Sequence, residues 1–423
     1  MKSASIESRD YSGKQRRRAG FDQFARRAVR ARLEQVQNGQ VVIRENGKHE
    51  AFGSLTDEIP LTTVLTIHDP RFYGEVAFGG AMGAAEAFIQ GYWSCDELTN
   101  LVRILLRNRH VLGEMETGFA SLSRPLLRFV HRRNRNTRAG SKRNIAAHYD
   151  LGNDFYELWL DRTMMYSSAV FERPDMALED ASVAKLDRIC RKLRLKDGDR
   201  VLEIGTGWGG FAVHAAKHYG CHVTTTTISR RQYEYASALV ESEGLADRID
   251  LLMKDYRDLE GRFDKLVSIE MIEAVGAEFQ PAFFAKCSEL LRPDGEMLLQ
   301  AITIADQNYA AYLRRVDFIR RYIFPGGCLT STTSMARSLT DATDMRIVHL
   351  EDIAPHYAET LRRWREAFHE RLDEVRALGY SEEFIRMWTY YLCYCEGAFD
   401  ERAIGNVQLH IAKPNARVDV VGF

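Results

Sequence analysis

The chain has 423 residues, more than one typical domain holds, so we expect two domains. Its apolar fraction of 45% is ordinary for a globular protein, and it contains no run of 18 apolar residues that could span a bilayer. The net charge of −1 hides an asymmetry, because residues 1–143 contain 24 Lys and Arg against 15 Asp and Glu. The polar, basic N-terminus also lacks the apolar core of a secretory signal, which predicts a cytoplasmic protein.

Two basic segments characterise residues 1–140. Residues 16–36 form a predicted amphipathic helix, in which apolar residues recur at helical spacing among arginines. Such a helix suits an anionic membrane surface, but it would equally pack against its own domain. Residues 124–143 are predicted to be an exposed linker. Nucleic acid would be attracted to this run, yet no recognition motif lies near it, so we predict no nucleic-acid partner. We expect 1–140 to be a basic domain that engages lipid or membrane, with its linker.

Strand and helix patterns alternate from residue 198 onward. This alternation predicts a doubly wound, Rossmann-like α/β sheet in a domain that covers residues 141–423. Seven strands are expected, at residues 200–204, 222–228, 249–253, 265–269, 296–301, 346–350 and 407–412.

Cysteine and histidine spacing argues against a metal centre. The seven cysteines are irregularly spaced without a CxxC pair, which disfavours both a disulfide framework and a cysteine zinc site. His214 and His218 lie four residues apart on a predicted helix, with His222 after them, but no glutamate completes a metalloprotease motif. We interpret them as part of a surface helix and predict no metal site.

The first predicted strand ends in a glycine-rich turn, EIGTGWGG at residues 203–210, and a predicted helix follows. Glycines in such a turn let the backbone approach a ligand at the helix N-terminus. Gly205, Gly207 and Gly210 also satisfy the GxGxxG pattern of dinucleotide-binding proteins, so NAD has to be considered as the cofactor.

Further features favour S-adenosylmethionine over NAD. The second strand ends at residues 225–229, which contain no acidic residue of the kind that binds the ribose in an NAD site. Asp255 and Tyr256 follow the third strand, where a polar group and a ring could bind an adenine. Residues 291–295, LRPDG, make a turn into the fifth strand that is common in methyltransferases. Glu203 ends a buried strand, and the ammonium of a methionine moiety would pair with its carboxylate.

Ordered motifs from residue 144 to the C-terminus resemble the cyclopropane-fatty-acyl-phospholipid synthase family, which includes mycolic acid methyltransferases. The motifs are HYDLGN at 148–153, YSS at 166–168, the turn at 203–209, TIS at 227–229 with Gln232, DYR at 255–257, EMIEAVG at 270–276, YIFPGG at 322–327 and HY at 356–357. The N-terminal part looks like the longer members, through Gly83, Glu86, Gly91, Trp93 and Asp96. The resemblance implies a seven-stranded class I methyltransferase sheet.

The resemblance also implies site residues. The positions that should hold S-adenosylmethionine are Tyr166, Ser167, Gly205, Gly207, Thr227, Gln232 and Tyr256, beside Glu203 and Asp255. The family binds a bicarbonate ion next to the reacting carbon through a Cys, a Glu, a His and a Tyr. Glu273 and Tyr357 match two of these positions, whereas Ser168 stands at the Cys position and Gln300 at the His position. Gln300 can donate a hydrogen bond to an anion but cannot titrate as His does.

The family's chemistry implies the reaction. The alkene attacks the sulfonium methyl group, a carbocation forms on the neighbouring carbon, and a base then removes a proton. Loss from the new methyl closes a cyclopropane, whereas loss elsewhere gives a methylene or methyl-branched product. We therefore expect a C-methyltransferase acting on the cis double bond of an unsaturated phospholipid acyl chain, peripheral to the inner face of the cell membrane. A homodimer is implied by the resemblance alone. The alternative is a methyltransferase for another lipid, such as a sphingolipid, or for a small metabolite.

Structural alternatives stay open for several of these residues. Glu273 could cap a turn, and Tyr357 could be a core tyrosine. The aromatic residues at helical spacing between Phe384 and Phe399 could line an acyl tunnel, although such a stripe is more often core.

Overall fold

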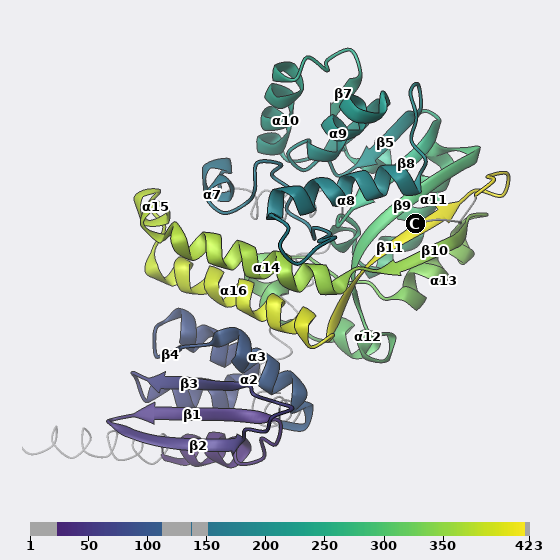
Figure 1. The fold of residues 1–423 in the computed structure, drawn as a ribbon. Helices are drawn as coiled ribbons and strands as arrows, with labels where there is room; N and C mark the ends of the chain where they lie inside the picture. The colour runs from purple at the N-terminus through teal and green to yellow at the C-terminus, as the bar shows by residue number, and fades with distance from the viewer. Residues whose placement is uncertain (1–22, 112–136, 138–150, 419–423) are drawn as a thin grey trace, which may run out of the picture. The chain divides into compact units, whose positions relative to one another are not determined.

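The computed structural model describes residues 23–111, 137 and 151–418 (Figure 1). The described residues divide into two compact units. The first combines the N-terminal region up to Leu127 with Gly379–Glu401, and the second combines Arg128–Leu378 with Arg402–Phe423. The predicted boundary near residue 140 lies outside the described residues. Gly379–Glu401 lies within the range 141–423 expected for the methyltransferase domain and groups with the first compact unit, and the domain bounds stay a prediction.

A four-stranded sheet forms the centre of the first unit. Its strands are β1 (Gly39–Glu45), β2 (Lys48–Ser54), β3 (Thr62–Ile67) and β4 (Trp93–Cys95), in the order β2-β1-β3-β4. β1 and β2 form a hairpin through Asn46 and Gly47, whose φ angles of 49° and 74° suit a tight two-residue turn. Helix α16 (Glu382–Asp400), from near the C-terminus, packs against α2 (Arg71–Ile89) and α3 (Leu98–Arg107).

Close packing explains why α16 belongs to the first unit. At Gly397 a Cβ would lie 2.9 Å from the Val102 side chain of α3, so only glycine allows this approach. Arg103 of α3 forms an ion pair with Glu401 at 2.9 Å. Three of the aromatic residues predicted to line a tunnel or fill a core are buried, namely Trp388, Tyr391 and Phe399. Their burial is what a core stripe requires, and the acyl tunnel stays a prediction.

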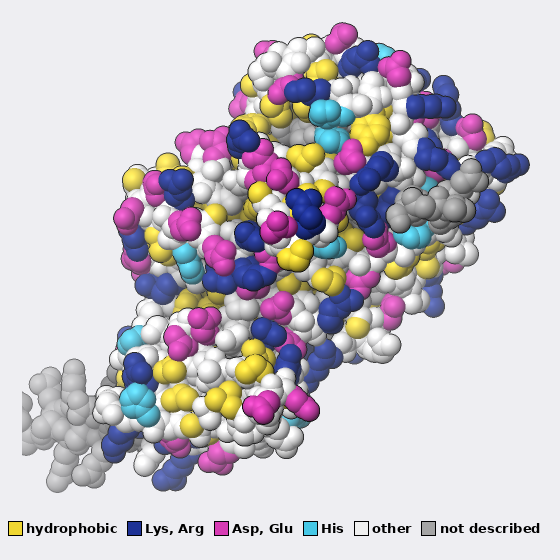
Figure 2. Space-filling view, in the orientation of Figure 1, with side chains coloured by type: hydrophobic (Ala, Val, Ile, Leu, Met, Phe, Trp, Pro, Cys, Tyr) yellow, Lys and Arg dark blue, Asp and Glu magenta, His cyan; other side chains and the backbone are white. Residues whose placement is uncertain are grey.

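The basic N-terminal helix is described over residues 23–33, which are helical as predicted. Its apolar side chains Ala25, Val29 and Leu33 are buried, and Arg26 and Arg30 form ion pairs with glutamates of β1 and β2. Figure 2 shows basic and acidic side chains interspersed over the visible face of the described residues. The apolar face of this helix therefore packs within its own unit, and a membrane contact through its exposed side stays a prediction. The second basic segment, 124–143, lies outside the described residues apart from Thr137.

The second unit contains a seven-stranded sheet in the order β10-β11-β9-β8-β5-β6-β7. Its strands are β5 (Arg200–Ile204), β6 (His222–Thr227), β7 (Ile249–Met253), β8 (Phe263–Ile269), β9 (Leu291–Ile304), β10 (Arg346–Asp352) and β11 (Ile404–Ala412). Strands β5 to β9 are mutually parallel, and β11 is antiparallel to both β9 and β10. The seven predicted strands and the α/β fold class are confirmed (Figure 1).

Helices cover both faces of this sheet because each strand presents apolar side chains to both faces. Leu202 and Leu266 lie in one core cluster, with residues of α11 (Gln280–Leu290) and α13 (Thr332–Ala342). Val201 and Val267, one residue away in each strand, lie in the opposite cluster, with residues of α8 (Leu178–Lys192), α9 (Gly210–Tyr219) and α10 (Arg230–Ser242). The remaining helices are α7 (Asn153–Glu157), α12 (Asp306–Leu313), α14 (Ala354–Glu370) and α15 (Leu372–Ala377).

The histidines considered as a metal pattern lie on and after α9. The His214 and His218 rings are 4.8 Å apart, and His214 is buried rather than on the surface. Burial lowers the pKa of His214, as does the charge of His218, so the imidazole is held neutral. Within the described ranges, no group of three His, Cys, Asp or Glu side chains is arranged to hold a metal ion. No helix in the described part of the chain is long and apolar enough to cross a membrane.

Candidate active site

The glycine-rich turn lies at the carboxyl end of β5, where ligands bind in open parallel sheets. Gly205 and Gly207 have φ angles of 106° and 54°. A Cβ on Gly205 would lie 3.2 Å from the Met271 side chain, and a Cβ on Gly210 would lie 2.7 Å from Met165 Sδ. The second contact places the segment that carries Tyr166 directly against the turn. We call this turn, residues 203–210, the cofactor cradle. Its glycines leave the backbone bare, and a side chain at Gly205 or Gly210 would fill the space beside it.

Glu203 is a buried carboxyl group beside this cradle. Thr225 Oγ1 donates a hydrogen bond of 2.6 Å to Glu203 Oε2, and 2% of Glu203 is exposed. Burial raises the pKa of Glu203 to about 8, a change that the bond from Thr225 and the charge of Lys185 only partly oppose. The ammonium group of S-adenosylmethionine would supply the missing positive charge, so the residues present fit this cofactor.

Ser167 lies on the other side of the turn and is also buried. Its Oγ accepts a 2.8 Å hydrogen bond from Lys185 Nζ of α8. Burial lowers the pKa of Lys185 to about 8, although the charges of nearby carboxylates oppose this. The adjacent Tyr166 ring packs in an aromatic cluster with Trp159 and Trp364, at centroid distances of 5.6 and 5.4 Å. A cationic group beside a polar serine suits a methionine carboxylate, and the rings suit its sulfonium.

The remaining predicted cofactor residues lie at the ends of β6 and β7. Thr227 Oγ1 donates to Gln232 Oε1 at 3.0 Å, which holds Gln232 at the start of α10. Asp255 turns its carboxylate toward Arg257, whose guanidinium donates at 2.8 and 2.7 Å. The Tyr256 ring packs edge-on against a buried phenylalanine of α11. The fold therefore places all nine predicted cofactor residues on elements at the carboxyl end of the sheet, and their individual contacts with S-adenosylmethionine stay predictions.

The predicted catalytic residues meet at a carboxylate that the sequence analysis did not single out, Glu270. Glu270 Oε1 accepts hydrogen bonds from Gln300 Nε2 at 2.9 Å and from Asn406 Nδ2 at 2.6 Å. It also accepts from the Ser168 backbone N–H at 3.0 Å. Glu270 Oε2 accepts from Tyr357 Oη at 2.7 Å. Three of the four residues that the resemblance assigned to an anion therefore surround a side-chain carboxylate.

The backbone of Glu270 departs from the usual conformation. Its φ angle is 49°, which costs a non-glycine residue about 1–2 kcal/mol. The Glu270 N–H donates to the Gln300 carbonyl at 2.8 Å, so the residue stays bonded to β9 after β8 has ended. Left-handed residues of this kind concentrate at functional sites, because the surrounding structure has to hold them there.

Glu273, which was predicted to act with Tyr357, lies elsewhere in the site. Its Oε1 accepts a 2.5 Å hydrogen bond from the Ile302 backbone N–H, and its buried Oε2 has no hydrogen-bond partner among the described residues. Burial is the main cause that raises the pKa of Glu273 to about 8, and the charge of Glu270 adds to it. Glu273 is therefore a neutral carboxylic acid at pH 7. The Ser168 hydroxyl also differs from expectation, since it donates to the neighbouring Ala169 carbonyl and not toward the reaction centre.

A separate bicarbonate ion does not fit this site. The backbone N–H of Ser168, the amide of Gln300 and the hydroxyl of Tyr357 are the donors that would hold it, and each already bonds Glu270. A second anion beside the carboxylate would be repelled by it. A signal in the sequence could have revealed Glu270, because a carboxylate at the end of a buried strand needs partners, as was recognised for Glu203.

Comparisons with known proteins agree with this geometry. Residues 136–409 match the family model described as mycolic acid cyclopropane synthetase. The chain is 38% identical to the tuberculostearic acid methyltransferase UfaA1 of Mycobacterium tuberculosis, over 80% of this chain and 81% of that protein. It is 37% identical to the cyclopropane-fatty-acyl-phospholipid synthase of Escherichia coli K12, over 80% and 85%.

A solved structure of the mycolic acid cyclopropane synthase CmaA1, complexed with SAH and CTAB, superposes with a TM-score of 0.60 at 33% identity. The match covers 64% of this chain and 98% of that one. Motifs, sheet order and cofactor cradle thus agree with one family. The chain belongs to the mycolic acid cyclopropane synthetase family of S-adenosylmethionine-dependent methyltransferases.

Proposed function

We propose that this enzyme adds a one-carbon unit to the cis double bond of an unsaturated phospholipid acyl chain and that Glu270 accepts the proton lost in the reaction. The observation that carries the proposal is the Glu270 carboxylate, held by four donors from four parts of the chain. The relatives support the substrate class, since UfaA1 is named for tuberculostearic acid and the Escherichia coli enzyme for fatty-acyl phospholipid.

Bound S-adenosylmethionine would supply an electrophilic methyl group. When an alkene carbon forms its bond to that methyl, the methyl–sulfur bond breaks, its electrons leave with S-adenosylhomocysteine, and the neighbouring carbon becomes a carbocation, which aromatic faces such as that of Trp364 would stabilise. Glu270 then takes one proton, and the released C–H electron pair neutralises the cation. The electrons close a ring if the proton comes from the new methyl, and form a double bond within the chain if it comes from an adjacent chain carbon. An exocyclic methylene forms if a hydride first moves from the methyl-bearing carbon to the cation and the proton then comes from the methyl. Glu273 is already protonated at pH 7 and is not the acceptor.

Glu270 differs from a bound ion because its position is set by the chain. Four donors fix both oxygens, so the basic lone pairs face one region of the substrate. We propose that the base does not depend on dissolved bicarbonate and that its fixed position selects which proton leaves. We further propose peripheral attachment to the inner face of the cell membrane and, from the resemblance, a homodimer.

Replacement of Glu270 by glycine tests the proton acceptor. The E270G variant relieves the left-handed backbone and leaves a space lined by the Gln300, Asn406 and Tyr357 donors, and its melting temperature shows whether it is folded. We expect turnover in bicarbonate-free buffer to fall at least a hundredfold, with the Kd for S-adenosylmethionine unchanged. Added formate, acetate or bicarbonate should restore part of the activity by occupying that space. E278Q, at an exposed residue nearby, is the matched control.

The assay uses liposomes of unsaturated phospholipid, and the released fatty acids are analysed by mass spectrometry and proton NMR. Upfield ring protons identify a cyclopropane and vinylidene protons a methylene product, which mass alone does not separate. Wild-type turnover of E270G without any added anion would exclude Glu270 as the base. Absence of an added carbon on any phospholipid would exclude the substrate class and direct the search to sphingolipids and soluble metabolites.

A further inference from the structure

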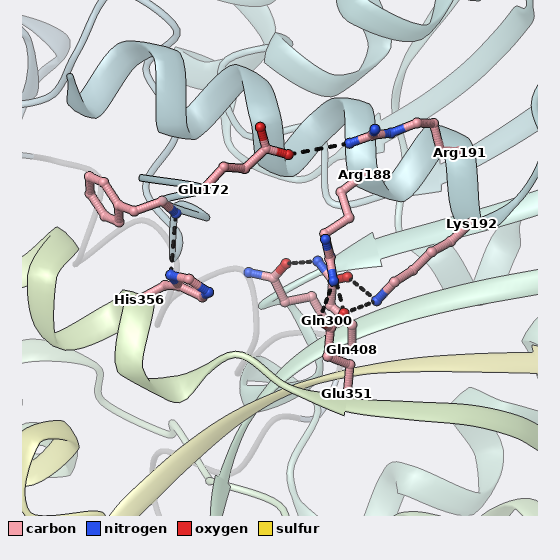
Figure 3. Close-up of polar contacts among 9 residues, drawn as sticks. Glu172, Arg188, Arg191, Lys192, Gln300, Glu351, His356 and Gln408 are labelled. Carbon is pink, nitrogen blue, oxygen red and sulfur yellow. Dashed lines mark hydrogen bonds and ion pairs between the residues drawn. The ribbon is translucent and has the colours of Figure 1, made fainter. Parts of the chain in front are cut away.

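A row of polar side chains crosses the sheet from Glu270 to a buried lysine, and Figure 3 shows its part from Gln300 through Gln408 to Lys192. Gln300 of β9 lies directly opposite Gln408 of β11, and Gln408 lies opposite Glu351 of β10. Lys192, at the C-terminal end of α8, reaches the row and donates 2.7 Å to Gln408 Oε1. Gln408 Nε2 in turn donates 3.0 Å to Gln300 Oε1. Gln300 Nε2 completes the row with its bond to Glu270.

The two ends of the row determine how both amides are oriented. A lysine ammonium has donors only, so the Gln408 atom that faces it has to be oxygen. The Gln408 NH₂ group then faces Gln300, which has to present its own oxygen. Gln300 is left with its NH₂ group toward Glu270, and a carboxylate is an acceptor only. A reversal of either amide would place two donors or two acceptors face to face in a buried site, which is costly.

The Lys192 end of the row is itself held in place. The Lys192 side chain is only 1% exposed, and its Nζ also donates a hydrogen bond to Glu351. Glu351 forms a second ion pair with Arg188, one turn earlier on α8. Burial by itself would raise the pKa of Glu351, but hydrogen bonds from Arg188 and Lys192 outweigh it and lower the pKa to about 2. The carboxylate is therefore ionised at every working pH, and it keeps Lys192 near the two amides.

We infer that Lys192 and Gln408 are positioning residues, which act through Gln300 to aim an N–H donor at the Glu270 carboxylate and so to hold the base in its productive position. Neither residue touches the reacting atoms. The inference rests on the proposed function of Glu270, and it adds a cause for the orientation of the base. It also explains why a lysine is buried in the sheet-facing side of α8, where an aliphatic residue would pack at lower cost.

Two variants break the row in different ways. Lys192→Met removes the ammonium while it preserves the length of the side chain. Gln408→Glu keeps a partner for Lys192 but accepts only, so Gln300 has to turn its NH₂ group toward residue 408 and its oxygen toward Glu270. Arg191→Met is the matched control, because Arg191 precedes Lys192 on α8 and its ion pairs, with Glu172 and Asp187, lie outside the row (Figure 3).

We expect kcat on phospholipid liposomes to fall about tenfold or more in Lys192→Met and Gln408→Glu. The KM for S-adenosylmethionine and its Kd should stay within about twofold of the wild type, since the cofactor cradle is untouched. Lys192→Arg keeps a donor-only cation and should retain more activity than Lys192→Met. Arg191→Met should behave as the wild type. The melting temperature and the Kd identify any variant that has not folded, and Gln408→Glu remains the test if Lys192→Met does not fold.

Folded Lys192→Met and Gln408→Glu enzymes with wild-type kcat and product ratio would overturn the inference. Equal loss of kcat and of cofactor affinity would also overturn it, because that pattern reports general disruption. The proposed function fails separately, through unchanged turnover of E270G without added anion. If E270G is inactive and rescued by formate while the two row variants are unimpaired, the base stands and only the positioning role falls.

Discussion

The cofactor cradle and the Glu270 site differ in how the chain builds them. The cradle is made mainly by consecutive residues between Glu203 and Gly210, and its main property is the absence of side chains. The Glu270 site is assembled from the ends or interiors of β8, β9, β11 and α14 and from the segment around Ser168. The first can be recognised from local sequence, whereas the second depends on side chains that meet only after folding. Variants in the two regions should therefore fail in different kinetic parameters.

The largest effect on cofactor affinity is expected at the cradle. Gly205→Ala places a methyl group 3.2 Å from Met271 and forces alanine to a φ angle of 106°, so we expect the Kd for S-adenosylmethionine to rise about thirtyfold to a hundredfold. Isothermal titration calorimetry measures the affinity directly. Gly244→Ala is a suitable control, since Gly244 has a φ angle of 66° but no atom within 4 Å of the added Cβ. Equal Kd values for both variants would contradict the proposed steric role of the cradle.

A smaller effect, on kcat, is expected at the Glu270 site. Tyr357→Phe removes the hydrogen bond to Glu270 Oε2 while the ring remains packed, so kcat should fall about tenfold with the cofactor Kd unchanged. Single-turnover kinetics with liposomes separates the chemical step from binding. Tyr219→Phe removes a similar tyrosine–carboxylate bond, from the end of α9 to Asp187 of α8, and should leave kcat unchanged. A loss of cofactor affinity in Tyr357→Phe would show that the two regions do not act on separate kinetic parameters.

The smallest effect is a pH dependence that belongs to the cradle alone. Because burial raises the pKa of Glu203 to about 8, the carboxyl group is mostly protonated in the free enzyme at pH 6–7 and has to lose its proton to pair with the ammonium of the cofactor. Affinity should therefore rise with pH between 6 and 8, by at most about tenfold per pH unit. Calorimetry in buffers of different ionisation enthalpy should detect proton release on binding. Glu203→Gln should bind more weakly and without this slope; a slope that persists in Glu203→Gln has another origin.

Some elements could be predicted from the sequence and others could not, for physical reasons. The seven strands were predictable because alternating strand and helix patterns and buried apolar runs are local properties of the sequence. The sequence did not reveal the neighbours of helix α16, since an aromatic stripe predicts a buried face but not which surface buries it. Its close approach at Gly397 to α3, almost 300 residues earlier in the chain, is a tertiary contact.

The candidate site shows the same division. In the structure Gln300, Tyr357 and Ser168 bond the Glu270 carboxylate, where the resemblance implied a bound ion, and their catalytic roles stay predictions. It also assigned the Ser168 hydroxyl a role that the backbone N–H of that residue takes. Glu270 lies three residues before Glu273, and its place directly after a buried strand was a local sign that it would need partners, but the donors themselves come from distant parts of the chain.

The sequence by itself determined the strand pattern, the glycine-rich turn and the family, because these depend on periodicity and on contiguous residue types. Only the tertiary structure decided which carboxylate is surrounded by donors and which is left as a neutral acid, because that choice follows from the backbone angle of Glu270 and from burial. The orientation of the Gln300 amide was likewise decided by folding, since it follows from Lys192 on α8 and Gln408 on β11. A hydrogen-bonded row across neighbouring strands depends on their register, and register is a property of the assembled sheet.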